Sequence, residues 1–191
     1  MKSVKVGKEI TRGEVAFPGK VWGKVRVFPG SPSPSQLDAL QRGEIIVTGK
    51  LDPPHTRYLA ELDKEGNILY AKGGTFPHFL LAVPKVLGII TDTGGRTSHG
   101  AFLGRDMFRV PTIVGTSPED ATKLLKTGDV VVLDADQGRV YEYLGGGEAI
   151  DENIAKWDTR YAKMGLRMTI RNILILKEMM LKGVEAPIVE E

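Results

Sequence analysis

Hydrophobic and polar positions along the chain follow two kinds of pattern, one typical of strands and one of helices. The segment "GEVAFPGKVWGKVRVF" (residues 13–28) alternates valines with polar residues around two glycines, which predicts strands joined by a tight turn or bulge. "EIIVT" (44–48) and "VLGIITD" (86–92) are nearly continuous apolar runs and predict buried strands. "VPTIVG" (110–115) predicts another strand, and "VVVLDADQGRVYEYL" (130–144) predicts a hairpin with a glycine in its turn.

Helical patterns lie between these strands. In "SPSQLDALQRGE", Ser33 is placed to cap a short helix and Pro34 to occupy its first position. Asp52 followed by proline opens a second helical pattern, which "DKEGN" closes before a short strand "ILYA". Residues 75–83 also predict a helix, and residues 117–129 predict a capped helix that stops at a glycine. The interleaving predicts one α/β domain.

The domain is expected to span residues 1–144, with its core at 13–144, and to be followed by a tail at 145–191. A run of three glycines, Gly145 to Gly147, marks the expected joint. Beyond it, apolar residues recur at helical spacing at Ile150, Ile154, Trp157, Tyr161, Ile170, Ile173, Leu174 and Leu181. Two interpretations stay open, a helix packed on its own domain or in a homo-oligomer, and a helix that docks on a partner protein.

Composition narrows the class of protein. The 191 residues carry 26 Lys and Arg against 24 Asp and Glu, and the net charge of +2 gives no field that favours nucleic acid as a partner. The absence of cysteine excludes disulfides and thiolate metal sites. The N-terminal residues contain no apolar signal segment, and "ILILKEMML" is too short and too charged to span a membrane. A soluble cytoplasmic protein is expected.

The segment "TDTGGRTSHGAFLGR" (residues 91–105) gathers the chemistry of the chain. A strand that ends at Asp92 and a helix that begins near Ser98 would place His99 in the first turn of the helix, where unpaired backbone N–H groups favour an anion. The anion could be a bound phosphate or a phosphoryl group carried on the imidazole, whose neutral nitrogen is a nucleophile near pH 7. The same spacing is also typical of an ordinary capped helix with a structural histidine.

The residues around His99 suit a phosphate. Gly94 and Gly95 would let the backbone approach it closely, and Arg96 would neutralise its charge. Thr97 and Ser98 would donate hydrogen bonds from their hydroxyls.

A longer stretch carries a family resemblance. "GIITDTGGRTSHGAFLGRDMFRVPTIVG" resembles the phosphohistidine motif of the mobile, swivelling domain of PEP-utilising enzymes, the group that contains phosphoenolpyruvate synthase and pyruvate phosphate dikinase. "FPGKVWGKVRVF", "GEIIVTGKLDPP" and "TGDVVVLDADQGRVYE" are similar to other segments of that domain, in the same order, over about residues 13–144. The resemblance implies a β/β/α swivelling fold, here with a C-terminal helical tail.

The resemblance also implies roles. In the family, the histidine that corresponds to His99 is phosphorylated by a nucleotide-binding domain, and the mobile domain then swings to a barrel that binds PEP or pyruvate. The residues that match Thr97, Ser98 and Arg105 flank that histidine. His99 is therefore the candidate catalytic residue, and the candidate phosphate-stabilising residues are Gly94, Gly95, Arg96, Thr97, Ser98 and Arg105.

Three features depart from the family. Where the family usually has small residues after the histidine, this chain has Gly100, Phe102 and Gly104. The packing of this helix is therefore expected to differ. A segment containing "NILYAKGGTFPHFLLAVP" is inserted between the Asp-Pro turn and the next strand, and its role is unexplained. The 191 residues are expected to hold neither an ATP-grasp domain nor a PEP-binding barrel.

The sequence thus predicts a phosphohistidine carrier, one component of a phosphotransferase that is incomplete alone. No cofactor is expected on this chain, and ATP and Mg are expected on a separate ATP-grasp nucleotide-binding protein. The acceptor is expected to be a PEP/pyruvate-binding or other protein, and neither nucleic acid nor membrane is expected as a partner. The alternative is a non-catalytic binding or regulatory module that kept the swivelling fold and an anion-binding helix terminus.

The sequence contains two other histidines, His55 and His78. His78 follows a Gly-Gly pair at the same spacing, but Phe76 and Pro77 precede it and supply no side-chain donor. His55 in "LDPPHTRYL" is expected on a loop or as a helix cap. A site made of the three histidines could hold a metal without cysteine, yet we expect no metal site.

Overall fold

The computed structural model describes residues 3–72, 80–147 and 167–168. Within them a barrel closes in the order β1-β7-β6-β3-β2-β8-β9. Its strands are β1 (Val4–Phe17), β2 (Lys20–Phe28), β3 (Ile45–Thr48), β6 (Gly88–Thr91), β7 (Thr112–Ser117), β8 (Val130–Asp134) and β9 (Arg139–Gly146). The neighbours β2, β3, β6 and β7 run parallel, and the remaining pairs are antiparallel. The predicted mixture of strands and helices is confirmed.

The central parallel strands are buried on both faces, which explains their continuous apolar runs. Along β3, Ile45 and Val47 point into one hydrophobic cluster while Ile46 points into the other. On β6, Ile90 and Ile89 divide in the same way. One cluster fills the barrel and the other lies under the helices, so the strands that lead to the site are held from both sides.

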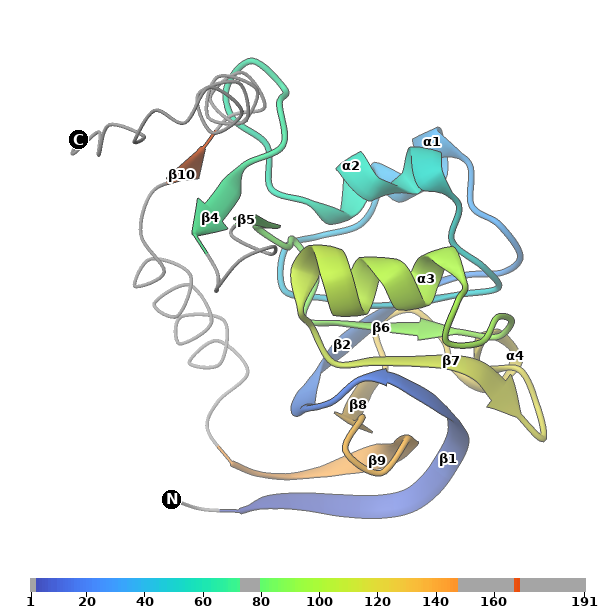
Figure 1. Cartoon of the computed structure of the whole chain (residues 1–191). Coiled ribbons are helices and arrows are strands. Elements are labelled where there is room, and N and C mark those ends of the chain that lie inside the picture. Colours follow the sequence, from blue (N-terminus) through green and yellow to red (C-terminus); the bar gives the residue numbers. More distant parts are fainter. Residues whose placement is uncertain (1–2, 73–79, 148–166, 169–191) are drawn as a thin grey trace.

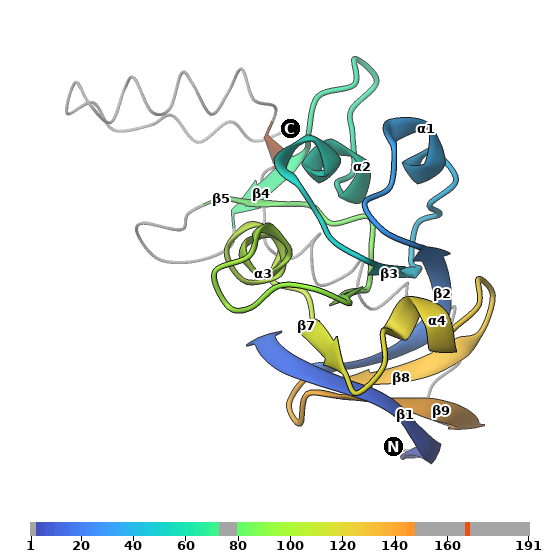
Figure 2. The ribbon, with the colours of Figure 1, turned by 90° about the vertical axis from the view of Figure 1, so that its right-hand side faces the viewer.

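The described helices are short. They are α1 (Pro34–Leu37), η1 (Pro53–His55), α2 (Thr56–Leu59), α3 (His99–Phe102), the π-helical segment η2 (Leu103–Phe108) and α4 (Ala121–Leu124). η2 continues α3 directly, and Figure 1 shows the two as one helix lying along β6 and β7. In Figure 2, α1, α2 and α3 lie on one side of the molecule, and β1, β8 and β9 lie on the other.

Local signals predicted the start of α1 correctly. Ser33 caps α1 through a complete capping box with Gln36, and Pro34 follows as predicted. The second helix is shorter than its apolar pattern suggests, because α2 ends at Leu59 and Leu62 instead forms a bridge to Ile68.

A second sheet lies outside the barrel, in the order β10-β4-β5. It consists of β4 (Tyr70–Lys72), β5 (Leu80–Ala82) and β10 (Arg167–Met168). The helix predicted at 75–83 is therefore wrong at 80–82, and its residues 75–79 lie outside the described residues. Leu81, Ala82 and Val83 are all buried in succession, a pattern that a strand covered on both faces shares with a buried helix.

The segment predicted to form the C-terminal helix lies outside the described residues except at 167–168, where the prediction is wrong. There Arg167 and Met168 pair with Ala71 and Tyr70, because the edge of β4 offers unpaired backbone groups. The glycines expected to form a joint begin within a strand, since Gly145 and Gly146 of β9 pair with β1. No helix among the described residues has the length and apolar character needed to cross a membrane.

Candidate functional site

Two loops meet at the carboxyl ends of the neighbouring parallel strands β3 and β6. Thr48 and Thr91 are partners in the register, so residues 49–52 and 92–98 leave the sheet side by side. The Asp92 N–H donates to the Thr48 carbonyl at 2.9 Å, and the Thr93 N–H donates to the Gly49 carbonyl at 3.0 Å. The carboxyl edge of a parallel sheet is where α/β proteins commonly bind ligands.

His99 is the first residue of α3, as the sequence predicted. Ser98 is the N-cap, with extended backbone angles, and its hydroxyl accepts a hydrogen bond from the Ala101 N–H at 3.3 Å. The Ser98 side chain is therefore committed to the helix start. His99 itself is half-buried at this start.

Two glycines allow the loop and the helix to approach their neighbours. Gly94 has φ +108°, and a Cβ there would lie 2.7 Å from both Cβ and Oγ of Ser98. Gly104 lies against Thr112 of β7 so closely that a Cβ would overlap the threonine side chain. The first glycine shapes the loop before His99, and the second lets the helix lie directly on the sheet.

The imidazole of His99 faces a hydroxyl from the other loop. Its Nε2 lies 3.4 Å from Oγ1 of Thr56, the first residue of α2. The Thr56 hydroxyl donates its one proton to the Pro53 carbonyl at 2.9 Å, so its oxygen is left to accept from His99. We therefore assign the Nε2–H tautomer to His99 in this state, with the free lone pair on Nδ1.

His55 is buried and caps η1, as expected from its place after two prolines. Its Nδ1 accepts a hydrogen bond from the Asp52 N–H at 2.9 Å. Among the described residues, no three His, Asp or Glu side chains are grouped to hold a metal ion. His78 lies outside the described residues.

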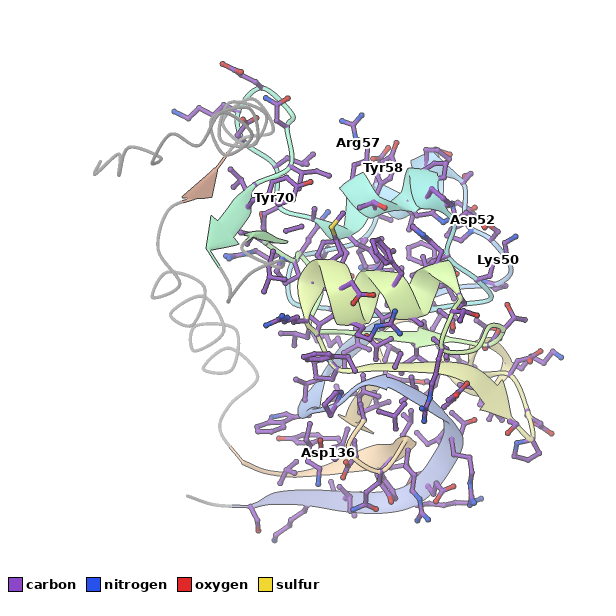
Figure 3. The ribbon with its side chains drawn as sticks, in the orientation of Figure 1. Lys50, Asp52, Arg57, Tyr58, Tyr70 and Asp136 are labelled. Atoms are coloured by element: carbon purple, nitrogen blue, oxygen red, sulfur yellow. The ribbon has the colours of Figure 1, made fainter. Side chains whose placement is uncertain are left out.

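The surroundings of His99 favour its neutral form overall. Burial lowers the pKa of His99 and is the largest cause; the nearby Asp52 carboxylate raises it and His55 lowers it further. Burial raises the pKa of Asp52, but hydrogen bonds from Ser31 and Lys50 and the charge of Lys50 outweigh it and lower that pKa overall. Figure 3 shows Lys50 and Asp52 beside the end at which α3 begins.

The two predicted arginines lie beside the loop before His99, and both of their guanidinium groups pair with carboxylates. Nε of Arg96 pairs with Glu14 at 2.8 Å. The Arg105 guanidinium pairs with Asp106 at 2.6 Å and donates to the Arg96 carbonyl at 2.9 Å, so it braces the loop. Thr97 is exposed. In this state the structure brings Gly94, Ser98 and His99 together and directs both guanidinium groups to carboxylates.

The sequence pattern predicts a helix start at Asp52 but no part in the site for Asp52 or Thr56. A usable signal was present, because "GKLDPPHT" and "TDTGGRTSH" both follow buried strands. Parallel neighbours place such loops at one edge of a sheet. What the sequence did not provide was the strand order that makes β3 and β6 neighbours.

Comparisons with known proteins agree with the motif. The family model described as "PEP-utilising enzyme, mobile domain" matches residues 62–138. The probable phosphoenolpyruvate synthase of Pyrococcus abyssi is 32% identical over 142 residues, which cover 74% of this chain and 14% of that protein. The phosphoenolpyruvate synthase of Pyrococcus furiosus is 44% identical over 141 residues, again 74% of this chain and 14% of the relative.

A third relative has a different name. The phosphoenolpyruvate-protein phosphotransferase of Haemophilus influenzae is 49% identical over 61 residues, which cover 32% of this chain and 10% of that protein. The chain thus spans a small fraction of the length of each of these relatives. The resemblance to the mobile domain of PEP-utilising enzymes is confirmed.

Proposed function

Since residues 62–138 match the mobile domain of PEP-utilising enzymes, we propose that this chain is a phosphoryl carrier and that His99 carries the phosphoryl group. A nucleotide-binding partner of the ATP-grasp type, which holds ATP and Mg, supplies the group. A second partner that binds PEP or pyruvate, or another acceptor, receives it. The domain swivels between the two partners.

The observation that carries this proposal is the position of His99 and the lowered pKa of its imidazole. Its imidazole stands at the beginning of a helix, half-buried, with a pKa lowered by burial. A neutral imidazole keeps a nitrogen lone pair for attack at neutral pH, whereas a protonated ring has none. Partial exposure leaves the ring within reach of a partner.

A ring nitrogen donates its lone pair to phosphorus as the P–O bond of the donor breaks, and the leaving oxygen takes that electron pair. Release of the proton on the other nitrogen returns the phosphorylated ring to neutrality. Transfer onward reverses these events at an acceptor oxygen. Attack through Nδ1 uses the lone pair that is free in this state, whereas attack through Nε2 requires the Thr56 contact to open.

The neighbouring groups have distinct parts in the proposal. Thr97 is exposed beside His99 and offers its hydroxyl to a phosphoryl oxygen. Arg96 and Arg105 reach the phosphoryl group after exchanging their carboxylate partners Glu14 and Asp106 for it. Both arginine pairs are exposed to solvent, which screens them and makes their contribution small, so the exchange costs little.

The test uses the full chain and ATP labelled separately in its β- and γ-phosphates, with candidate nucleotide-binding partners. Label that is lost in acid and retained in base is expected on the wild-type chain and absent from His99→Ala. His78→Ala and His55→Ala should keep the label. The two labels identify which phosphoryl group moves.

Adding the labelled chain to an acceptor protein with pyruvate should then move the label to PEP. Label retained by His99→Ala would overturn the assignment of the carrier residue. A wild-type chain that binds a partner but takes up no label with any of them would support the alternative, a binding module without catalysis.

A further inference from the structure

Phe102 packs against the imidazole of His99 from one helical turn further along α3. The centroids of the two rings are 5.8 Å apart and their planes are inclined by 28°, a stacked arrangement. The Phe102 side chain nevertheless remains 42% exposed, and it is the one aromatic residue among the large exposed apolar side chains of the described region. Single exposed apolar side chains are common at protein surfaces, so the stacking of Phe102 on His99, rather than its exposure, is what suggests a role.

The contacts of His99 come from two directions. Thr56 meets the Nε2 edge of the ring from α2, and Phe102 meets the ring face from α3. An imidazole turns about two side-chain torsions, and a contact at one edge alone leaves the tilt of the ring unfixed. A second contact against the face restricts that tilt.

We propose that Phe102 is a positioning residue for His99, whose ring holds the imidazole in the orientation that presents Nε2 to Thr56. The inference rests on the proposed function of His99 as the phosphoryl carrier. It adds a residue that sets the geometry of the nucleophile through packing rather than through a hydrogen bond. A ring held in one orientation reaches the geometry for attack at a smaller entropic cost.

The surroundings of His99 allow this role to be isolated. The titratable groups that act on its pKa are Asp52, which raises it, and His55, which lowers it, and both belong to the loop and helix turn after β3. A substitution at Phe102 changes neither group. Removing the ring reduces the burial of His99, which is the largest cause of its lowered pKa.

The experiment combines two readouts on the full-length chain. Nitrogen-15 NMR spectra follow the titration and tautomer of His99, and phosphoramidate serves as a small phosphoryl donor that needs no partner protein. The variants are Phe102→Ala, Phe102→Leu, which keeps apolar volume without a ring, and Phe102→Tyr, which keeps the ring. Leu124→Ala removes a comparably exposed apolar side chain (38%) from α4 and is the matched control.

In Phe102→Ala, the pKa of His99 should rise toward 6.5 and the rate of labelling at His99 should fall by about two- to tenfold, the range that an aromatic pair contributes. Phe102→Tyr should restore both readouts, and Phe102→Leu should restore the titration better than the rate. Leu124→Ala should behave as the wild type.

Phe102→Ala with an unchanged titration and rate would overturn the proposal, and so would a changed rate with an unchanged titration and tautomer. The outcome for the proposed function is separate. If a nucleotide-binding partner labels no histidine of the wild type while Phe102→Ala still alters the titration and the phosphoramidate rate, the carrier function fails and the positioning role of Phe102 stands.

Discussion

Oγ1 of Thr56 lies 3.4 Å from Nε2 of His99, although the two residues are 43 positions apart in the chain. The pairing of β3 with β6 brings them together, since each residue belongs to the segment that follows one of these strands. The contact fixes which ring nitrogen bears the proton in this state, because the Thr56 proton is used by the Pro53 carbonyl. Thr56 thus links the segment after β3 to His99, which follows β6.

Replacing Thr56 by valine tests this coupling. Thr56→Val keeps the shape of the side chain and removes both hydrogen bonds, so the His99 ring loses its partner at Nε2. The rate of phosphoryl labelling should fall by about two- to tenfold, the effect of one hydrogen bond. Thr56→Ser retains the hydroxyl and should stay near the wild-type rate. A valine variant as fast as the serine variant would contradict a role for the hydroxyl.

The buried carboxylate of Asp92 is predicted to stabilise the site rather than to take part in transfer. It accepts hydrogen bonds from Thr116 Oγ1 at 3.3 Å, Thr122 N–H at 3.1 Å and Thr122 Oγ1 at 2.5 Å, and so ties the end of β6 to the start of α4. Asp92→Ala leaves these donors unpaired and should reduce the free energy of unfolding by about 3 kcal/mol, measured by denaturant titration.

Asp120→Ala is the control for that loss. It removes a carboxylate from the same end of α4, but one that forms only an exposed pair with Lys123 at 2.7 Å. Its cost should stay below about 1 kcal/mol. Equal losses in the two variants would show that the Asp92 network has no special weight.

The midpoint of the His99 titration should lie below pH 6.5, because burial lowers the pKa of His99 from that ordinary value. The unfolded chain then takes up a proton at a higher pH than the folded chain, so this histidine's contribution to stability is present above pH 6.5 and is lost as the pH falls below it. Asp52→Asn removes the charge that raises the pKa of His99 and should move the NMR titration to still lower pH.

Asp136→Asn removes a carboxylate from the turn between β8 and β9, far from Asp52 in Figure 3, and should leave the titration of His99 unchanged. An Asp52→Asn variant that titrates at higher pH than the wild type would contradict the electrostatic account. A midpoint above pH 6.5 for His99 in the wild-type chain would contradict the account of burial.

Features set by interactions between neighbouring residues could be predicted from the sequence, whereas features set by contacts between distant residues could not. The start of α3 was predictable because Ser98 caps it through its neighbour Ala101, and the strand before it because Ile89 and Ile90 lie in a short apolar run. The contact with Thr56 depends on strand order, for which the local pattern holds no signal.

Local patterns do not predict the orientation of the arginines or the second sheet either, because both depend on partners that are distant in the sequence. Arg96 pairs with Glu14 of β1, which is distant in the sequence, and the spacing of residues around His99 does not suggest this partner. Residues 80–82 were predicted helical because consecutive apolar residues suit either element, and their partner strand β4 decides the outcome.

Substitutions of the two glycines of the motif should differ in their effect, although the sequence suggests one role for both. Gly94 has φ +108°, where a side chain is strained, and its Cβ would lie 2.7 Å from the cap residue Ser98. Gly95 has no such φ, and the nearest neighbour of a Cβ there would be the flexible Glu14 carboxylate at 3.4 Å.

Gly94→Ala should therefore displace the Ser98 cap, lower the free energy of unfolding by about 1–3 kcal/mol and slow labelling of His99. Gly95→Ala should stay close to the wild type in both denaturant titration and labelling. If Gly95→Ala slows labelling as much as Gly94→Ala while both remain folded, then both glycines are needed for close approach of the phosphoryl group, and the helix cap does not explain the effect.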